Sequence, residues 1–215
     1  HPSPAVRKVP KIGGTKDPDL ERLRALAPTH LIVNIDENRR EQVEELARFV
    51  PHVIVTHPNT PEDNLDLFCL FGAIFHREHE AEKLAADFRA ARAELRRATQ
   101  DLPRQRVLYL IWKDPWMTVA RDTYISAMLA SAGWDTLPEA STTRYPDVAA
   151  VLQGLTFTDR VLLSTEPYRF TENHLVAAEA RFRAPAQLID GEMVSWYGSR
   201  AAAGLRYLAQ LRRVG

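Results

Sequence analysis

The sequence predicts an α/β protein in which two lobes with parallel strands are joined by one long α-helix. Short runs rich in β-branched residues alternate with longer helical patterns, which is typical of parallel strands connected by helices. The stretch from Pro61 to Gln100 interrupts this alternation, because it carries no strand pattern. The chain therefore divides into an N-terminal lobe, a bridging helix and a C-terminal lobe, over residues 1–74, 75–100 and 101–215.

Five apolar runs are predicted to form the strands of the two lobes. Most of them are nearly continuous in apolar residues and do not alternate with polar ones, which indicates strands covered on both faces. The predicted strands are Thr29–Ile35, His52–Thr56, Arg106–Trp112, Asp159–Ser164 and Ala186–Asp190.

Helices are predicted between these strands from apolar spacing and from end signals. Asp17 is placed as the N-cap of the first helix, with Pro18 at its first helical position. The other predicted helices are Asn38–Phe49, Tyr124–Ala132 (ended by Gly133), Pro146–Leu152, Glu172–Phe182 and Ser199–Leu211.

The segment Phe75–Gln100 is predicted to be the bridging helix. It is rich in Ala, Glu, Arg and Leu, which are good helix formers. Its apolar residues Leu84, Phe88, Ala91 and Leu95 recur at spacings of three and four, which places them in one stripe. A helix of about 24 residues is ~36 Å long, far longer than an ordinary crossover helix.

Composition excludes several classes of function. Lys and Arg total 28, as do Asp and Glu, so we expect no nucleic-acid partner and no anionic membrane surface. Cys69 is the only cysteine, which excludes an intramolecular disulfide, and its apolar neighbours predict a buried, inert thiol. No apolar run approaches the roughly 18 residues that span a bilayer. The segment that begins at His1 does not resemble a signal peptide.

Aromatic residues are the most informative feature of the predicted loops. Several fall at or just after strand ends, where a rigid ring with a polar tip can meet a ligand, although packing at the edge of a lobe is the alternative. They are Trp112, Trp116, Tyr168, Trp196 and Tyr197, interleaved with Lys113, Asp114, Arg121, Glu166, Asp190, Glu192 and Arg200. This mixture predicts a large, flat, partly charged ligand.

Three other patterns have structural readings that outweigh the functional ones. Gly13 and Gly14 precede a helix but lack the spacing of a phosphate-binding loop. His76 and His79 share a helix face at i,i+3, yet two ligands do not complete a metal site. Ser164 lacks the sequence context of a nucleophilic serine.

Several blocks of the sequence together carry a family resemblance. The most specific is Gly13–Glu21, which is followed by Leu26–Asn34 and Glu37–Arg39. Later segments agree in order and pattern, and they are Trp112–Met117, Arg121–Tyr124 and Asp190–Glu192, together with Glu78, Glu80, Ala81 and Leu84 of the long helix. These blocks resemble the helical-backbone metal receptors, which are the periplasmic cobalamin- and siderophore-binding proteins of ABC importers.

The resemblance implies two Rossmann-like lobes joined by one long helix, with a ligand held between them. It implies no catalysis, and we expect no resident cofactor and no metal site. By motif position, the ligand-binding residues are Asn34, Glu37 and Asn38 in the first lobe and Trp112, Trp116, Glu166, Tyr168 and Trp196 in the second. Glu192 is expected to meet a basic residue of an ABC permease in the inner membrane.

The family also implies a periplasmic location and a metal chelate as ligand. Corrinoid, haem and siderophore all suit aromatic walls with a few charged anchors, so the sequence does not choose among them. Family members begin with a further strand, loop and helix before the region that starts here at His1, and the first lobe is therefore expected to be incomplete. Two alternatives stay open, namely a chelate-binding or sensor module without transport, and an α/β metal-dependent enzyme using His76, His79 or Glu166.

Overall fold

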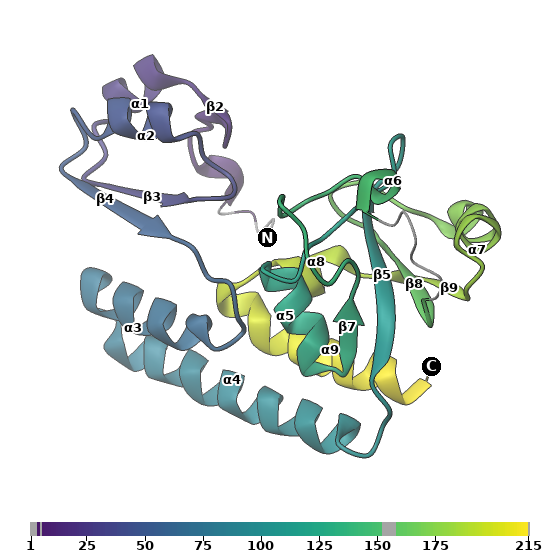
Figure 1. Cartoon of the computed structure of the whole chain (residues 1–215). Coiled ribbons are helices and arrows are strands. Elements are labelled where there is room, and N and C mark those ends of the chain that lie inside the picture. The colour runs from purple at the N-terminus through teal and green to yellow at the C-terminus, as the bar shows by residue number, and fades with distance from the viewer. Residues whose placement is uncertain (1–3, 5, 152–157, 215) are drawn as a thin grey trace. The chain divides into compact units, whose positions relative to one another are not determined.

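The computed structural model describes residues 4, 6–151 and 158–214 and divides the chain into two compact units. Unit 1 comprises residues 1–57 and unit 2 comprises residues 58–215 (Figure 1). The lobe boundaries expected after residues 74 and 100 stay a prediction. In the described part of the chain, no helix combines the length and the apolar character needed to cross a membrane.

Unit 1 is built around a parallel pair of strands that align from His30 opposite His52 to Asn34 opposite Thr56. Leu23, Val33 and Leu46, from one strand and two helices, are buried. Figure 1 shows both helices on the same side of the strand pair. The elements are η1 (Val6–Lys8), β1 (Gly13–Gly14), β2 (Asp17–Pro18), α1 (Leu20–Leu26), β3 (His30–Asn34), α2 (Arg40–Leu46) and β4 (His52–Thr56).

The start of α1 differs from the sequence prediction. The N-cap is Asp19, whose carboxylate accepts a hydrogen bond from the Arg22 amide at 3.0 Å, so the assignment of Asp17 as the cap was wrong. Asp17 instead belongs to a tight antiparallel pair with the preceding glycines. Gly13 has φ +90°, and a Cβ there would lie 2.7 Å from the Asp17 carbonyl oxygen, so this turn requires glycine.

Unit 2 begins with two helices, α3 (Asp63–Phe75) and α4 (Glu78–Thr99). His76 has φ 55°, a left-handed conformation that ends α3, so the long helix starts two residues later. A Cβ at Gly72 would lie 2.7 Å from the Ala81 methyl carbon, which means that α3 approaches α4 closely at this point. The predicted long helix is confirmed, and it runs without interruption for 22 residues.

The buried stripe of α4 is close to the predicted one. Phe88, Ala91 and Leu95 are buried as expected, but Ala85 takes the place of Leu84, which is 37% exposed. This stripe packs against α9 (Ala201–Val214). The long helix is therefore part of the core of unit 2.

The main sheet of unit 2 has five strands within the described residues. Its order is β6-β5-β8-β9, with β7 also paired to β5, and every pairing except that of β6 is parallel. The predicted strands in this region are confirmed to within one residue, whereas the two short ones were missed. The bounds are β5 (Gln105–Trp112), β6 (Met117–Thr118), β7 (Trp134–Thr136), β8 (Arg160–Ser164) and β9 (Ala186–Ile189).

Alternate side chains of β5 enter two separate cores. Val107 and Tyr109 join the core shared with α4 and α9, whereas Leu108 and Leu110 join a second core with Phe170. Figure 1 shows α5, α8 and α9 on one side of β5 and α7 on the other. Helices cover both faces, which explains the continuous apolar runs. The remaining elements are α5 (Tyr124–Ser131), α6 (Val148–Val151), η2 (Glu172–His174), α7 (Leu175–Phe182), α8 (Gly191–Ser195) and η3 (Gly198–Arg200).

Several of the predicted helices differ in extent from the observed ones. The predicted helix Asn38–Phe49 is observed as Arg40–Leu46, and the predicted helix Ser199–Leu211 as Ala201–Val214. The predicted helix Glu172–Phe182 is divided into η2 and α7, and α6 is shorter than the predicted Pro146–Leu152, whose last residue lies outside the described part.

The exposure of Cys69 corrects a second prediction. The apolar run around it lies in α3, where Leu67 and Phe68 are buried but Cys69 is exposed. A helix buries one face, so an apolar run does not bury every member.

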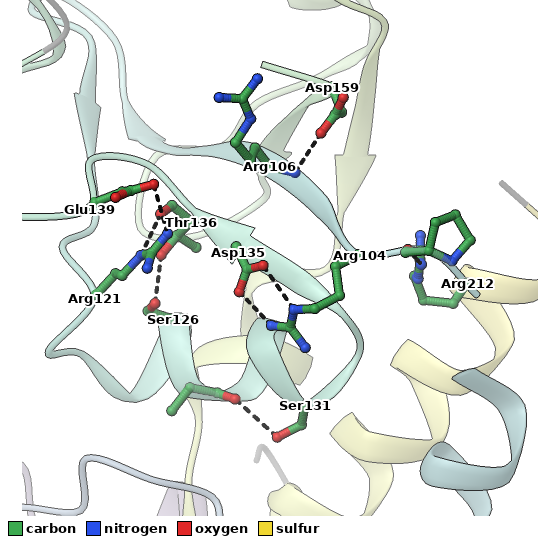
Figure 2. A network of polar contacts seen from close by, with 12 residues as sticks. Arg104, Arg106, Arg121, Ser126, Ser131, Asp135, Thr136, Glu139, Asp159 and Arg212 are labelled. Carbon is green, nitrogen blue, oxygen red and sulfur yellow. Dashed lines mark hydrogen bonds and ion pairs between the residues drawn. The ribbon is translucent and has the colours of Figure 1, made fainter. Parts of the chain in front are cut away.

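The amino ends of the parallel strands carry a polar network (Figure 2). Arg104 donates from Nε to the Asp135 carboxylate at 2.9 Å, and the Arg106 amide donates to Asp159 at 2.6 Å. Arg212 of α9 donates to the Pro103 carbonyl at 2.8 Å. These contacts hold the amino ends of the strands together, at the edge of the sheet opposite to the predicted site residues of unit 2.

Candidate ligand-binding site

The carboxyl ends of β5, β8 and β9 meet at one edge of the sheet in unit 2. The three strands are parallel, with Leu110 opposite Leu163 and Leu163 opposite Leu188. The segments that follow them begin at residues 113, 165 and 190 and therefore leave the sheet at the same edge. Open α/β sheets bind ligands outside this edge.

A chain of five aromatic rings, here called the aromatic cluster, connects these segments. Trp112 meets Tyr168 edge-on at 5.4 Å between ring centroids, and Tyr168 lies 4.6 Å from Phe170. Phe170 stacks on Trp116 at 5.8 Å with an interplanar angle of 3°, and Trp116 meets Phe182 edge-on at 5.6 Å. Such offset and edge contacts each add roughly 0.5–1.5 kcal/mol beyond burial.

Exposure increases along the aromatic cluster from the core to the surface. Phe170 is 1% exposed, Trp116 and Tyr168 are half-buried, and Trp112 is 42% exposed. The buried end fixes the orientation of the exposed end without closing it off. Trp112 is therefore accessible in part, while its role as a ligand-binding residue stays a prediction.

Two polar side chains lie against the aromatic cluster. Lys113 places its ammonium nitrogen 5.9 Å from the centre of the Trp116 ring. His174 accepts at Nδ1 from the Thr171 amide at 3.0 Å, so its neutral form carries the proton on Nε2, 3.4 Å from the Tyr168 hydroxyl. Tyr168 accepts this long hydrogen bond and retains its own proton for donation.

Glu166 follows β8 in a tightly built turn. The Ser164 hydroxyl accepts from Tyr109 at 2.9 Å and donates to the Glu166 carbonyl at 2.5 Å. A Cβ at Gly191 would collide with Ser164 and lie 2.8 Å from the Glu166 nitrogen, so α8 approaches this turn closely. Tyr109 is fully buried, and burial raises the pKa of its hydroxyl above the ordinary value.

Trp196 lies just after α8 and is 38% exposed. The Arg200 guanidinium lies 5.2 Å from the centre of its ring, a cation–π arrangement. Arg200 also pairs with the Glu192 carboxylate at 2.9 Å. Asp190 begins α8 by accepting from the Glu192 amide at 3.0 Å. These contacts define the orientation of the indole from one side.

The predicted site residues of unit 1 hold their own loop together. The Asn34 side chain donates to the Thr56 carbonyl at 3.0 Å and accepts from the Asp36 amide at 2.8 Å. Asn38 accepts from the Asn34 amide at 2.8 Å and donates to the Thr15 carbonyl at 2.8 Å. Asn38, the first residue of the predicted helix Asn38–Phe49, therefore lies before α2 and does not cap it, because its side-chain amide spans the loop instead. The N-cap of α2 is the next residue, without a side-chain bond.

Glu37 is the exposed one of the three predicted site residues of unit 1. Its carboxylate accepts from the Thr15 hydroxyl at 3.4 Å, a weak contact that leaves most of the group in solvent. Thr15 belongs to the turn after the glycine pair, so that turn braces the loop after β3. A ligand-facing role for Asn34, Glu37 and Asn38 stays a prediction.

The structure also places the residues of the alternative readings. His76 ends α3 outside α4, so it shares no helix face with His79, and the i,i+3 assignment was wrong. Ser164 is buried and occupied by hydrogen bonds. Across the described ranges, no group of three or more His, Cys, Asp or Glu side chains is arranged to hold a metal ion.

Sequence reasoning identified part of the assembly at the sheet edge. Trp112, Trp116 and Tyr168 come together, and Trp196 forms a second group with Glu192. Phe170, Phe182 and His174 were missed as members of the first group. The separation of two between Tyr168 and Phe170 was the available signal, because alternate residues of an extended segment share a face.

The sequence matches the periplasmic binding protein family over residues 2–151. No curated protein matches it. Several solved structures share its fold. The periplasmic vitamin B12-binding protein BtuF of Vibrio cholerae has a TM-score of 0.80 at 16% identity, covering 98% of this chain and 84% of that one.

Two haem-related structures are also similar. Staphylococcus aureus IsdE, crystallised with haem, has a TM-score of 0.78 at 15% identity, covering 96% of this chain and 85% of that one. A periplasmic haem-binding protein of Pseudomonas aeruginosa has a TM-score of 0.77 at 19% identity, covering 99% of this chain and 81% of that one. At these identities the likeness establishes the fold, with two α/β lobes and a long helix.

Proposed function

This chain belongs to the periplasmic binding protein family, and we propose that it captures a flat metal chelate and delivers it to an ABC permease. The family consists of substrate-binding proteins and not of enzymes, and it implies a periplasmic location. The metal-dependent enzyme considered from the sequence is therefore set aside.

The aromatic cluster is the observation that supports a chelate with a large conjugated or apolar face. Trp112 offers a rigid ring at the sheet edge, held in place by Tyr168 and the buried Phe170. Rings fixed in advance lose little conformational entropy when a flat ligand stacks on them. Proteins of the same fold include a vitamin B12-binding protein and a protein crystallised with haem, which agrees with this ligand class.

The polar residues around the aromatic cluster suit the periphery of such a chelate. We assign Lys113 and Arg200 as anchors for carboxylate or amide groups, because both lie beside an exposed or half-buried indole. Tyr168 can donate a hydrogen bond from its hydroxyl, and Glu166 would accept one. In unit 1, Glu37 is proposed to face the ligand, whereas Asn34 and Asn38 shape the loop that carries it.

Tryptophan fluorescence titration tests the ligand class. Haemin, cyanocobalamin and a ferric siderophore are added separately to the wild-type protein and to Trp112→Ala. We expect saturable quenching by at least one chelate and binding weakened by about tenfold or more in the variant, which loses an aromatic contact of roughly 1–3 kcal/mol. Absence of saturable quenching by all three would contradict the proposal.

A matched control separates the site from the core. Trp134 is 1% exposed, its ring faces Arg212, and its indole donates to Gln105, so it lies within the packed interior. Trp134→Phe should alter the intrinsic fluorescence but leave the dissociation constant within about twofold. If Trp134→Phe weakened binding as much as Trp112→Ala, the effect would be one of stability and not of contact.

Delivery to a permease is proposed to use Glu192. Its side chain is 34% exposed and pairs with Arg200, so charge reversal would also disturb the contact of Arg200 with Trp196. Glu192→Gln is the better variant, since it keeps the shape and a hydrogen-bond acceptor. We expect ligand affinity within about threefold of wild type but slower uptake into vesicles that hold the permease, since interfacial charges govern docking rate. Unchanged uptake would remove Glu192 from the docking surface, and intact binding without any uptake would indicate a sensor.

A further inference from the structure

The first turn of α3 contains a fully buried asparagine. Asn64 is 0% exposed, and each polar atom of its side chain has a partner. Its Nδ2 donates to the Pro61 carbonyl at 2.7 Å and to the Tyr124 hydroxyl at 3.1 Å. Its Oδ1 accepts from the Gly198 amide at 2.6 Å, across 134 residues of sequence. A buried amide with such long-range partners joins three separate segments.

The most distant of these segments follows Trp196 directly. Gly198 has φ +75°, a conformation that favours glycine, and its amide points to Asn64. The intervening residue, Tyr197, meets the Tyr124 ring edge-on at 5.9 Å. Asn64 and Tyr124 together therefore hold the two residues that come after Trp196. The Arg200 guanidinium lies 5.2 Å from the centre of the Trp196 ring.

Independent contacts also hold the first turn of α3 to other segments of unit 2. The Asp63 carboxylate accepts from the Asn59 amide at 2.7 Å and from the Thr60 amide at 2.9 Å. Arg144 donates to the Asn59 side chain at 2.8 Å. The segment through which the chain enters unit 2 thus has a fixed conformation, and Asn64 extends that fixed conformation to the Trp196 loop.

We propose that Asn64 is a positioning residue that sets the place of Trp196 at the ligand-binding edge. This inference rests on the proposed function insofar as Trp196 lines the ligand site. Asn64 is 0% exposed and acts through the Gly198 amide, so it contacts no ligand itself. Without its Oδ1, the Gly198 amide loses its partner and the loop gains conformational freedom. Ligand binding would then have to order that loop, which weakens affinity.

Fluorine NMR of protein labelled with 5-fluorotryptophan tests the positioning directly. The chain has four tryptophans, whose resonances are assigned by single Trp→Phe substitutions. Asn64→Ala should shift and sharpen the Trp196 resonance and leave the Trp134 resonance in place. Tyr124→Phe removes one partner of Asn64 but keeps the ring against Tyr197, so it should produce a smaller change in the same direction. This milder variant covers the case in which Asn64→Ala does not fold.

The matched control is a variant that loses a buried side-chain hydrogen bond elsewhere in unit 2. Thr136→Val removes the buried hydroxyl contact between Thr136 and Ser126, which measures 2.5 Å, on the strand that carries Trp134. It should move the Trp134 resonance and leave that of Trp196 unchanged. Equal movement of all resonances in every variant would show general loosening and overturn the inference, as would an unmoved Trp196 resonance in folded Asn64→Ala and Tyr124→Phe.

Titration of the same variants with haemin and cyanocobalamin gives the functional result. The dissociation constant should rise roughly three- to tenfold in Asn64→Ala and stay within twofold of wild type in Thr136→Val, since ordering one side chain or loop costs about that factor. Equal affinities in wild type and Asn64→Ala would overturn the link to binding. If the wild type binds neither of these chelates nor a ferric siderophore, the proposed function fails, while the Trp196 resonance still decides whether Asn64 positions the indole.

Discussion

The substitution Gly204→Ala should have two opposite effects on the stability of the protein, a gain in helix propensity and a steric clash. Gly204 lies inside α9, where replacing glycine by alanine ordinarily stabilises a helix by about 1 kcal/mol. Here a Cβ would collide with the Met193 carbonyl oxygen of α8 and lie 3.1 Å from the Met128 methyl carbon. A methyl group can rotate away, but the backbone carbonyl moves only if α8 moves.

The steric effect is expected to exceed the gain in helix propensity. Overpacking of a close contact costs about 1–3 kcal/mol, and contact with backbone belongs to the upper part of that range. Subtracting the gain of about 1 kcal/mol leaves a net destabilisation of about 1–2 kcal/mol. Because α8 carries Glu192 and ends beside Trp196, the displacement should also weaken chelate binding.

Urea unfolding followed by tryptophan fluorescence and circular dichroism measures this difference. Ala203→Gly is the control, since Ala203 is an exposed neighbour in the same helix and reports the helix-propensity effect alone, about 1 kcal/mol of destabilisation. A Gly204→Ala protein that is more stable than wild type would refute the close approach of α8 and α9. Loss of stability with unaltered affinity would refute the link from α8 to the site.

Three further predictions concern stability and accessibility. Arg104 holds the pKa of Asp135 below its ordinary value through a hydrogen bond, so Arg104→Gln should lower stability by about 0–1 kcal/mol near pH 7. A carboxyl group whose pKa is lowered by folding stabilises the protein at pH values above its unfolded-state pKa, and this stabilisation is lost as the pH falls through its folded-state pKa. The stabilities of wild type and variant should therefore converge as the pH falls below about 4. Divergence of the two stabilities in that range would contradict the argument. Cys69 should react in the native protein with a thiol reagent at one equivalent, and protection until unfolding would refute its exposure. Phe170→Ala should cost about 3–5 kcal/mol in thermal unfolding, and a loss under 1 kcal/mol would contradict its place as the buried anchor.

The strands were the most predictable part of the fold. Parallel strands covered on both faces need continuous apolar residues, so runs such as Arg106–Trp112 identify themselves without knowledge of their partners. The short strands at Met117–Thr118 and Trp134–Thr136 were missed because two or three residues acquire strand conformation only by pairing with β5. The same reasoning explains why the short hairpin at Asp17–Pro18 was read as a helix start.

The helices were predictable in position and less so in their ends and faces. The apolar spacing located α4, but its start depends on the left-handed residue His76, for which the sequence holds no strong signal. The predicted buried stripe contained Leu84, whereas the neighbouring residue Ala85 is the buried one. The α3 segment was too uniformly apolar to show a period, so neither its helix nor the exposed face with Cys69 could be read from it.

Polar and aromatic candidates differ in how well a single sequence predicts their use. An amide or carboxylate near a strand end can be bound by other groups of the chain. Here Asn34 donates to the Thr56 carbonyl, Asn38 donates to the Thr15 carbonyl, and Glu192 pairs with Arg200. Those partners are set by backbone path, which the sequence alone does not show. An indole has one donor and a large ring surface, and Trp112 at the end of β5 stays 42% exposed, whereas Trp134 is packed in the interior. For this fold, aromatic residues after parallel strands are therefore stronger evidence for a ligand site than polar residues in the same loops.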